Sequence, residues 1–233
     1  MATLDAPPLS VIIPTLDAAA ALPPTLAALA EGREQGLIRE ILVADGGSHD
    51  ATIALAERRG ARAVAAPRGR GAQLAAGGAA AAGAWLLFLH ADTRLAPGWA
   101  AAVAAFIGAN GNAERAGYLR FRLDDASSAA RRVEAVVAWR CRVLALPYGD
   151  QGLLIAAPLY RAIGGFRPLP LMEDVDLIRR LGRRRLLALD IDAVTSAARY
   201  RDGGYVRRPL RNLGCLTLYF LGLPPRVLLR LYG

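Results

Sequence analysis

The stretch that decides the fold is Trp85–Arg94, which reads WLLFLHADTR. Its apolar run follows Gly83 and Ala84 and ends abruptly at polar side chains, as is typical of a buried parallel strand. Open α/β sheets bind ligands at the carboxyl ends of such strands, so we expect His90 and Asp92 to face a crevice. An Asp at that point can hold a divalent cation through oxygen. It can also simply begin the next helix.

Similar apolar runs lie on both sides of this stretch, and helical patterns separate them. We predict strands over 9–14, 40–44, 61–65 and 85–89, with helices that end near Glu31 or span 51–59, 70–82 and 97–107. This alternation indicates βαβ units, and so an α/β fold with a mostly parallel open sheet and helices on both faces. Later elements are less regular: strands over 117–123, 153–157 and 183–192, a long helix over 127–144 and a short one that begins at 172–176.

The length and composition predict one large domain over residues 1–206, followed by a tail over 207–233. The chain has 233 residues, and 54% of them are hydrophobic, which is enough for a sizeable core. Pro224-Pro225 interrupts the apolar part of the tail, so we expect two short amphipathic helices rather than a membrane span. These helices can pack on the domain, on another subunit or on a membrane surface.

The charge is strongly positive, but its pattern does not fit a nucleic-acid-binding protein. The formal charge is +9, all 29 basic residues are Arg, and aromatic residues make up only 6% of the chain. Scattered Arg without interleaved aromatics suits a phosphate-bearing ligand or an anionic membrane surface equally well.

Cysteine usage and the first residues bear on the compartment. Cys141 and Cys215 are too far apart in sequence for a zinc or redox motif, and we expect both to be buried. Residues 1–10 lack a charged and then apolar leader. The sequence therefore predicts a cytoplasmic protein, with peripheral contact at the inner membrane face left open.

Several segments, taken in order, resemble the family 2 glycosyltransferases of the GT-A fold. They are LSVIIPTLD (9–17), ILVADGGSHD (41–50), RGRGAQLAAGGAAAAGAWLLFLHADT (68–93), YGDQG (148–152) and LPLMEDVDL (169–177). The HADT form and the late segment ARYRDGG (198–204) resemble a bacterial subgroup of short members. Each motif alone is weak, but their common order is specific.

The resemblance implies transfer of a sugar from a nucleoside-diphosphate donor to an unknown hydroxyl acceptor, with a lipid-linked acceptor left open. It implies donor contacts from Pro14, Thr15, Asp17, Asp45, Gly46, Arg70, Gln73, His90, Ala91 and Asp92. Asp17 and Ala18 stand where relatives usually have Asn and Glu, and Ala75 stands in place of an Asn. Asp45 has an alternative interpretation as the residue that starts a turn before Gly46.

The same resemblance implies a metal and a base. Asp92 is the expected ligand of Mg²⁺ or Mn²⁺, whereas His90 replaces the more usual Asp and suits a hydrogen bond to the ribose or to a metal-bound water. Asp174, paired with Glu173, is the expected general base of a single displacement that inverts the anomeric carbon. The two carboxylates could instead only complement a helix dipole.

Four further residues are candidates for contact with the acceptor or with phosphate. Asp150 and Gln151 are expected on the acceptor side, where turn chemistry is the alternative explanation. Arg199 and Tyr200 are candidates for contact with phosphate or acceptor, and a plain surface role is equally compatible with them.

Two other classes of protein compete with this interpretation. A nucleotidyltransferase needs a Gly-rich loop with Arg and Lys after the first strand, and residues 14–22 (PTLDAAAAL) contain none of these. A non-catalytic protein that binds nucleotide or a membrane surface would explain the basic tail. It would not explain why Asp45, Asp92 and Asp174 all fall at predicted strand ends or helix starts.

Overall fold

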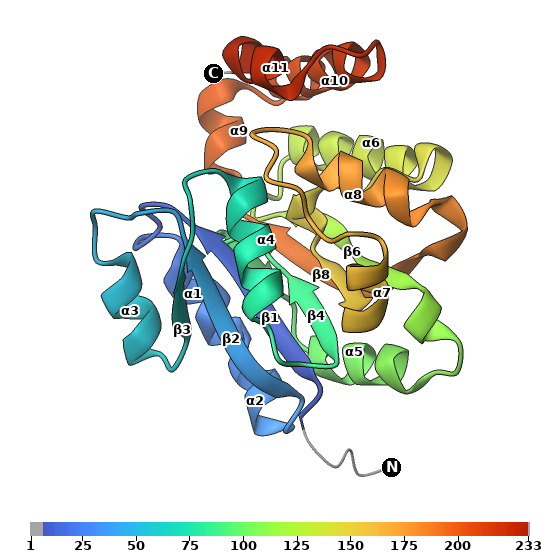
Figure 1. The fold of residues 1–233 in the computed structure, drawn as a ribbon. Coiled ribbons are helices and arrows are strands. Elements are labelled where there is room, and N and C mark those ends of the chain that lie inside the picture. The colour runs from blue at the N-terminus through green and yellow to red at the C-terminus, as the bar shows by residue number, and fades with distance from the viewer. Residues whose placement is uncertain (1–6, 233) are drawn as a thin grey trace.

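The computed structural model describes residues 7–232 and contains one open, curled sheet (Figure 1). Its eight strands are β1 (Leu9–Thr15), β2 (Ile38–Asp45), β3 (Arg62–Ala65), β4 (Trp85–Phe88), β5 (Thr93–Leu95), β6 (Ala116–Leu123), β7 (Leu153–Ala156) and β8 (Leu186–Thr195). They are arranged in the order β3-β2-β1-β4-β7-β6-β8-β5. Residues 1–6, on which part of the expectation about a leader rests, lie outside the described residues.

The first half of the sheet forms as the apolar runs predict. β1 pairs in parallel with β2 and β4, and β2 pairs in parallel with β3. Every residue of β1 and of β4 is buried, because helices cover both faces of the sheet there. The carboxyl ends of these four strands therefore lie along one edge.

The second half of the sheet is mixed. β7 runs antiparallel to both β4 and β6, β6 runs parallel to β8, and β5 runs antiparallel to β8. Four of the seven strand pairs are parallel, so the prediction of a mostly parallel sheet is confirmed. The last strand was placed too early, since Arg183–Arg185 form a 3₁₀ turn and the strand continues to Thr195.

The helices are α1 (Leu22–Ala28), α2 (Ala30–Glu34), α3 (Thr52–Arg58), α4 (Arg70–Ala80), α5 (Trp99–Gly108), α6 (Ser128–Leu144), α7 (Ala157–Ala162), α8 (Glu173–Leu181), α9 (Ala198–Gly203), α10 (Arg207–Phe220) and α11 (Pro225–Tyr232). Helix α4 lies in front of β1 in Figure 1. Its small residues allow close packing, because a Cβ on Gly77 would lie 2.4 Å from Ile12 Cγ2. This contact sets the position of the helix that begins at Arg70.

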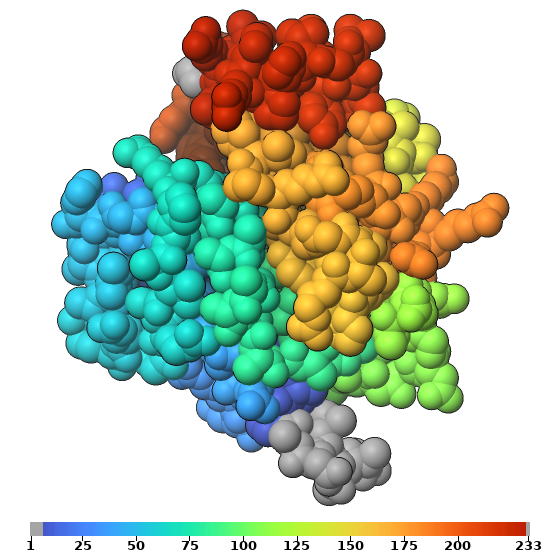
Figure 2. Space-filling view, viewed as in Figure 1, coloured from blue at the N-terminus to red at the C-terminus, as the bar shows by residue number. Residues whose placement is uncertain are grey.

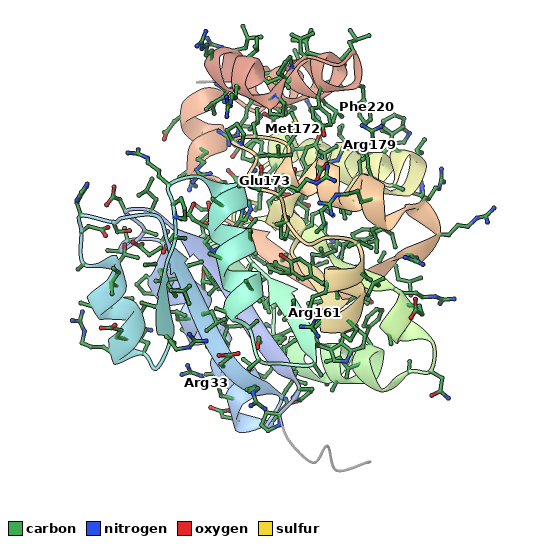
Figure 3. The ribbon with its side chains drawn as sticks, viewed as in Figure 1. Arg33, Arg161, Met172, Glu173, Arg179 and Phe220 are labelled. Atoms are coloured by element: carbon green, nitrogen blue, oxygen red, sulfur yellow. The ribbon has the colours of Figure 1, made fainter. Side chains whose placement is uncertain are left out.

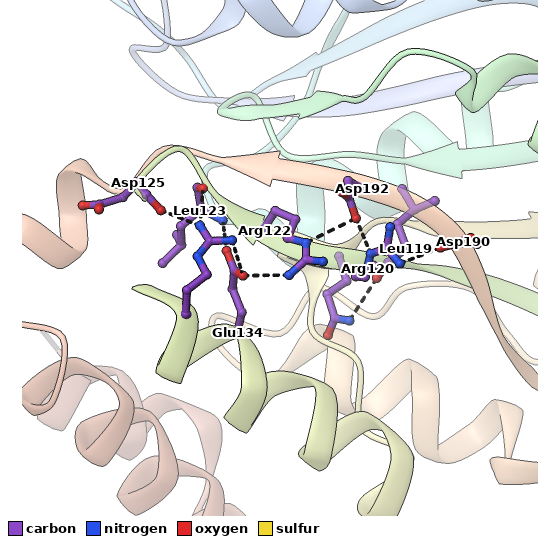
Figure 4. Close-up of polar contacts among 10 residues, drawn as sticks. Leu119, Arg120, Arg122, Leu123, Asp125, Glu134, Asp190 and Asp192 are labelled. Atoms are coloured by element: carbon purple, nitrogen blue, oxygen red, sulfur yellow. Dashed lines mark hydrogen bonds and ion pairs between the residues drawn. The ribbon is translucent and has the colours of Figure 1, made fainter. Parts of the chain in front are cut away.

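A buried carboxylate fixes α6 against the sheet (Figure 4). Glu134 Oε1 accepts a hydrogen bond of 2.8 Å from Leu123 N, and Oε2 accepts bonds of 2.8 Å from Arg122 and 2.7 Å from Arg131. The buried charge is thus compensated by two cations and one backbone amide. Helix α6 is held firmly along β6 as a result.

The tail folds as two amphipathic helices that cover one end of the molecule (Figure 2). Cys215, Leu216 and Leu228 are buried and belong to the same apolar core as the sheet, and Cys141 is buried as well. The Arg179 guanidinium of α8 lies 5.1 Å from the ring centroid of Phe220 (Figure 3). Among residues 7–232, no helix is long and apolar enough to cross a bilayer.

Candidate active site

The segment His90–Asp92 stands where the two halves of the sheet meet. It leaves the carboxyl end of β4 and leads directly into β5, which pairs with β8 at the far edge. Where the chain leaves one strand and continues at a distant part of the sheet, a crevice opens at the carboxyl ends of the strands. Two cavities open there, of about 350 and 340 Å³, and both are lined by Arg70, His90, Asp92, Ser196 and Arg199.

The first cavity lies beside β1, and we call it the β1-side cavity. Eight of the ten predicted donor-binding residues line it, namely Pro14, Thr15, Asp17, Arg70, Gln73, His90, Ala91 and Asp92. They come from the ends of β1 and β4, from the start of α4 and from the loops between them. Residues from three distant parts of the sequence are thereby brought together at the predicted place.

Asp45 and Gly46 do not line this cavity; they lie directly behind it. The Asp45 carboxylate accepts hydrogen bonds from the Thr15 hydroxyl, from the backbone amides of Gly47 and Ser48, and from the Ser48 hydroxyl. Burial acts to raise the pKa of Asp45, but these hydrogen bonds outweigh it and lower the pKa. In this structure Asp45 holds the turn and orients Thr15, while its contact with a nucleoside stays a prediction.

Gln73 has a similar supporting position. Its side-chain amide nitrogen donates to the carbonyl of Thr15 and, at 3.2 Å, to that of Ala44. A Cβ on Gly46 would lie only 2.9 Å from this nitrogen. Gln73 therefore ties the ends of β1 and β2 together, and glycine at position 46 leaves the space this requires.

The second cavity lies beside α8, and we call it the α8-side cavity. It is lined by Asp174 and Met172 at the start of α8, by Tyr148, Gly149 and Asp150, and by Thr195 and Tyr200, among others. Met172 adopts a left-handed conformation with φ of 63°, which turns the chain sharply into the helix. Asp92 and Asp174 therefore open onto one cavity, although they are far apart in sequence.

Glu173, the neighbour of Asp174 at the start of α8, does not line this cavity. It is almost fully buried and forms an ion pair with Arg70 Nε, while its Oε2 has no hydrogen-bond partner within residues 7–232. Burial raises its pKa, Arg70 counteracts this, and Asp174 adds to it. Glu173 thus fixes the Arg70 guanidinium, which lines both cavities, rather than facing either of them.

His90, Gly149 and Asp174 are in close contact. Gly149 N donates a 2.9 Å hydrogen bond to Asp174 Oδ2, and a Cβ on Gly149 would lie 2.7 Å from His90 Nε2. That nitrogen is buried and has no hydrogen-bond partner in the part of the chain that the structure describes. Burial lowers the pKa of His90 well below its ordinary value, and the cations Arg70 and Arg199 lower it further. The imidazole is therefore neutral near neutral pH and keeps a lone pair for a ligand or hydrogen-bond donor.

The YGDQG loop contributes two kinds of residue. Burial raises the pKa of Asp150, which lines the α8-side cavity, and its buried Oδ1 has no hydrogen-bond partner among the residues described. Gln151 faces away: its side chain accepts from Arg140 at 3.1 Å and donates to the Leu119 carbonyl at 3.1 Å. The loop thus presents Asp150 to the cavity and uses Gln151 to hold itself on β6.

The groups that could hold a cation are few. Arg199 approaches Asp92 Oδ2 at 3.7 Å, and His90 lies in the same wall. Within the described chain no group of three or more His, Cys, Asp or Glu side chains converges as a complete metal site. One carboxylate beside a neutral imidazole fits a hard cation only if a ligand with oxygen atoms completes the coordination.

The family model for glycosyl transferase family 2 matches residues 10–153, which is more than half of the chain. The chain belongs to this family. It is therefore a glycosyltransferase, and the alternative of a nucleotidyltransferase or a non-catalytic binding protein is not supported. Among curated proteins none matches this chain.

Solved structures agree on the fold. The glucosyl-3-phosphoglycerate synthase from Mycobacterium tuberculosis, solved with Mn²⁺, uridine diphosphate (UDP) and glucosyl-3-phosphoglycerate, is 21% identical over 88% of this chain and 78% of that chain, with a TM-score of 0.60. The mannosyl-3-phosphoglycerate synthase from Rubrobacter xylanophilus is 18% identical over 92% and 75%, with a TM-score of 0.62. S. aureus TarS (residues 1–349) is 15% identical over 97% and 69%, with a TM-score of 0.58. These similarities confirm the GT-A fold.

Some residues that line these cavities were not predicted from the sequence. Tyr148 lines the α8-side cavity, and burial raises its pKa to about 12, so its hydroxyl stays protonated. Ser196 lines both cavities because β8 extends further than predicted. Arg208 and Asn212 of α10 also line the α8-side cavity. Only the position of Tyr148, within the YGDQG motif, gave a signal that could have identified it.

Proposed function

We propose that this glycosyltransferase uses a nucleoside-diphosphate sugar and a divalent cation, and that it inverts the anomeric carbon of the sugar. The observation that carries the proposal is that Asp92 and Asp174 line one cavity, which is joined to the β1-side cavity by Arg70, His90 and Arg199. The first cavity then takes the nucleoside diphosphate, and the second takes the sugar and the acceptor hydroxyl.

The charges of the shared wall support a diphosphate there. Arg70 and Arg199 line both cavities, and guanidinium groups bind phosphate oxygens by charge-assisted hydrogen bonds. Glu173 orients Arg70 from behind and is itself shielded from the cavity. The Arg70 guanidinium can therefore bind a negatively charged group while Glu173 keeps it aligned.

The residues present also fit a divalent cation. The Asp92 carboxylate and the neutral His90 imidazole leave most coordination positions to the oxygens of a donor, as the chemistry of Mg²⁺ and Mn²⁺ allows. The glucosyl-3-phosphoglycerate synthase of the same fold was solved with Mn²⁺ and UDP. When bound, such a cation would neutralise charge on the departing diphosphate.

Asp174 is the proposed general base. Gly149 N holds its Oδ2, and Val175 N holds Oδ1 at 2.8 Å, so the carboxylate is oriented at the cavity wall. A carboxylate so placed can accept the proton of an attacking hydroxyl as the new glycosidic bond forms. Asp150, whose pKa is raised by burial, lines the same cavity and can accept a hydrogen bond from the acceptor there.

Thermal unfolding with UDP tests the nucleotide and metal parts of the proposal. With Mn²⁺, UDP should raise the Tm of the wild-type protein, because only the folded state binds it, and EDTA should abolish the shift. Asp92→Asn should lose the shift without losing the fold. The matched control is Asp190→Asn, at a carboxylate whose side chain is 87% exposed and which does not line either cavity. An equal shift in Asp92→Asn and in wild type would contradict the assignment of the cation to Asp92.

A further inference from the structure

A third cavity, of about 360 Å³, lies between α6 and the start of α10. We call it the α6–α10 groove. It is lined by Ala129, Arg132, Val133, Val136, Val137, Arg140, Tyr148, Tyr200, Tyr205, Val206, Pro209, Leu210, Asn212 and Leu213. Apart from two Arg and one Asn, these side chains are aliphatic or aromatic.

The groove adjoins the α8-side cavity. Tyr148, Tyr200 and Asn212 line both spaces, so the two spaces border each other at these side chains. The rings are fixed in place: Arg140 lies 3.4 Å from the Tyr148 ring centroid, and Tyr200 stacks on Tyr205 with centroids 5.8 Å apart. An apolar groove therefore begins beside the cavity that contains Asp174.

The border between the two spaces also contains a buried polar atom that lacks a partner among the described residues. The side-chain oxygen of Asn212 is buried and has no hydrogen-bond partner among the described residues. Such an atom favours a ligand that donates a hydrogen bond at this point. A polar group in the α8-side cavity and an apolar group in the groove would therefore satisfy both surfaces.

We propose that the α6–α10 groove binds the alkyl chain of the acceptor, so that the acceptor is an amphiphile with its hydroxyl at Asp174 and its chain between α6 and α10. The inference rests on the proposed function, because it places the acceptor hydroxyl in the α8-side cavity. The groove has the volume of a small-molecule pocket, whereas surfaces that bind proteins are broad and flatter. Val136, Leu210 and Leu213 expose apolar area in its wall, and a chain bound there would remove that area from water.

The two helices that form the groove, α6 and α10, are both held in place by contacts with the rest of the fold. The Glu134 network holds α6 on β6 (Figure 4), and Cys215 and Leu216 anchor α10 in the core. Because the groove is preformed, binding of an alkyl chain does not carry the entropic cost of ordering the side chains that line it.

The experiment is calorimetric titration of the full chain with 1-hexanol, 1-octanol and 1-decanol. In wild type, the affinity should rise about fourfold for each added methylene. Leu213→Arg places a cation in the groove at a side chain that is 55% exposed, so the fold should tolerate it. In Leu213→Arg, the affinity should rise less than twofold for each added methylene. Leu221→Arg is the matched control, since Leu221 is 73% exposed and lies outside the groove.

Equal increases with chain length in Leu213→Arg and in wild type would overturn the proposal, as would affinity that does not depend on chain length. Sedimentation velocity and vesicle binding identify other occupants. A wild-type dimer that Leu213→Arg dissociates would assign the groove to a second copy. Binding to phosphatidylglycerol vesicles that is lost in Leu213→Arg, without alkanol binding, would assign it to a bilayer surface, and either result overturns the proposal.

The Tm shift with UDP and Mn²⁺ separates this inference from the proposed function. Leu213→Arg should keep the shift, since Leu213 does not line the β1-side cavity. No shift in wild type, together with alkanol affinity that depends on chain length, would refute the proposed donor and leave the groove as an apolar binding site. A Tm shift in wild type, together with alkanol affinity that does not depend on chain length, would refute only the proposal that the groove binds an alkyl chain.

Discussion

At the scale of single residues, the site depends on close contacts that leave no room for added atoms. His90 is held neutral by burial and by two neighbouring cations, and Gly149 packs directly against its ring. The same glycine donates its amide to Asp174. One residue without a side chain therefore positions the proposed base and limits where the imidazole can lie.

Gly149→Ala would disturb this packing. The new methyl group would lie 2.7 Å from His90 Nε2, so the ring or the loop must move. We expect hydrolysis of a nucleotide sugar, with water in the place of the acceptor, to slow on the order of 10²-fold, because catalysis is sensitive to small displacements. Release of nucleoside diphosphate measures the rate. Gly214→Ala is the control, since a Cβ there has no described neighbour within 4 Å. Equal rates in the two variants would refute the packing argument.

At the scale of elements, a strand could be predicted from the sequence where its own residues form a recognisable pattern. The apolar runs of β1, β2 and β4 need no partner to be recognised, and the polar residues at their ends indicate the site. β5 has only three residues around the exposed Arg94, and it forms because β8 offers a free edge. Such a strand leaves no periodicity that a sequence could reveal.

Contacts between distant elements could not be predicted. Glu173 falls in a family motif, but its ion pair with Arg70 depends on how closely α4 approaches the loop before α8. A Cβ on Gly71 would lie 2.5 Å from the carbonyl oxygens of Arg167 and Leu169, which shows how closely they pack. The role of Asp45 behind Thr15 also depends on tertiary packing, so the sequence could indicate the position but not the contact.

A hydrogen bond from the segment between α9 and α10 should make the thermal stability depend on pH. Tyr205 donates a hydrogen bond to Asp125, and this bond, followed by that from Ser127 N, lowers the pKa of Asp125 from 3.8 to about 2. Because the folded pKa is lowered, the stabilisation is complete above about pH 4 and is lost as the pH falls towards 2. Tyr205→Phe should therefore lower the Tm at pH 6, and its difference from wild type should shrink towards pH 2. Calorimetry at several pH values measures this.

Asp125→Asn provides the cross-check for that prediction. It should reproduce the pH dependence of Tyr205→Phe, and the double variant should lose little more than either single one. A difference between Tyr205→Phe and wild type that stays constant down to pH 2 would show that the carboxylate is not the partner that matters.

At the scale of the whole molecule, three cavities lie in series across one end of the sheet. The β1-side cavity shares Arg70, His90 and Asp92 with the α8-side cavity, which shares Tyr148, Tyr200 and Asn212 with the α6–α10 groove. The tail helices help to line the second and third of these spaces. The tail therefore lines these cavities as well as covering the core.

Burial of the tail gives a prediction on stability. Leu228 of α11 is fully buried in the main core, so Leu228→Ala should reduce the free energy of unfolding by about 2 to 5 kcal/mol. Leu231→Ala on the same helix removes an exposed side chain and should cost less than about 1 kcal/mol. Urea denaturation compares the two variants. Similar small losses in both would mean that the tail does not pack on the domain in solution.

The central claim is that Asp92 and Asp174 share one cavity and perform different tasks. Asp174→Asn tests it most directly, with Asp190→Asn as the control. Asn can still accept the Gly149 amide hydrogen bond but cannot accept a proton as a base. The account predicts that binding of UDP with Mn²⁺ is unchanged in calorimetry, while hydrolysis of the nucleotide sugar falls by about 10² to 10⁴-fold. Normal hydrolysis in Asp174→Asn, or a parallel loss of UDP affinity, would contradict it.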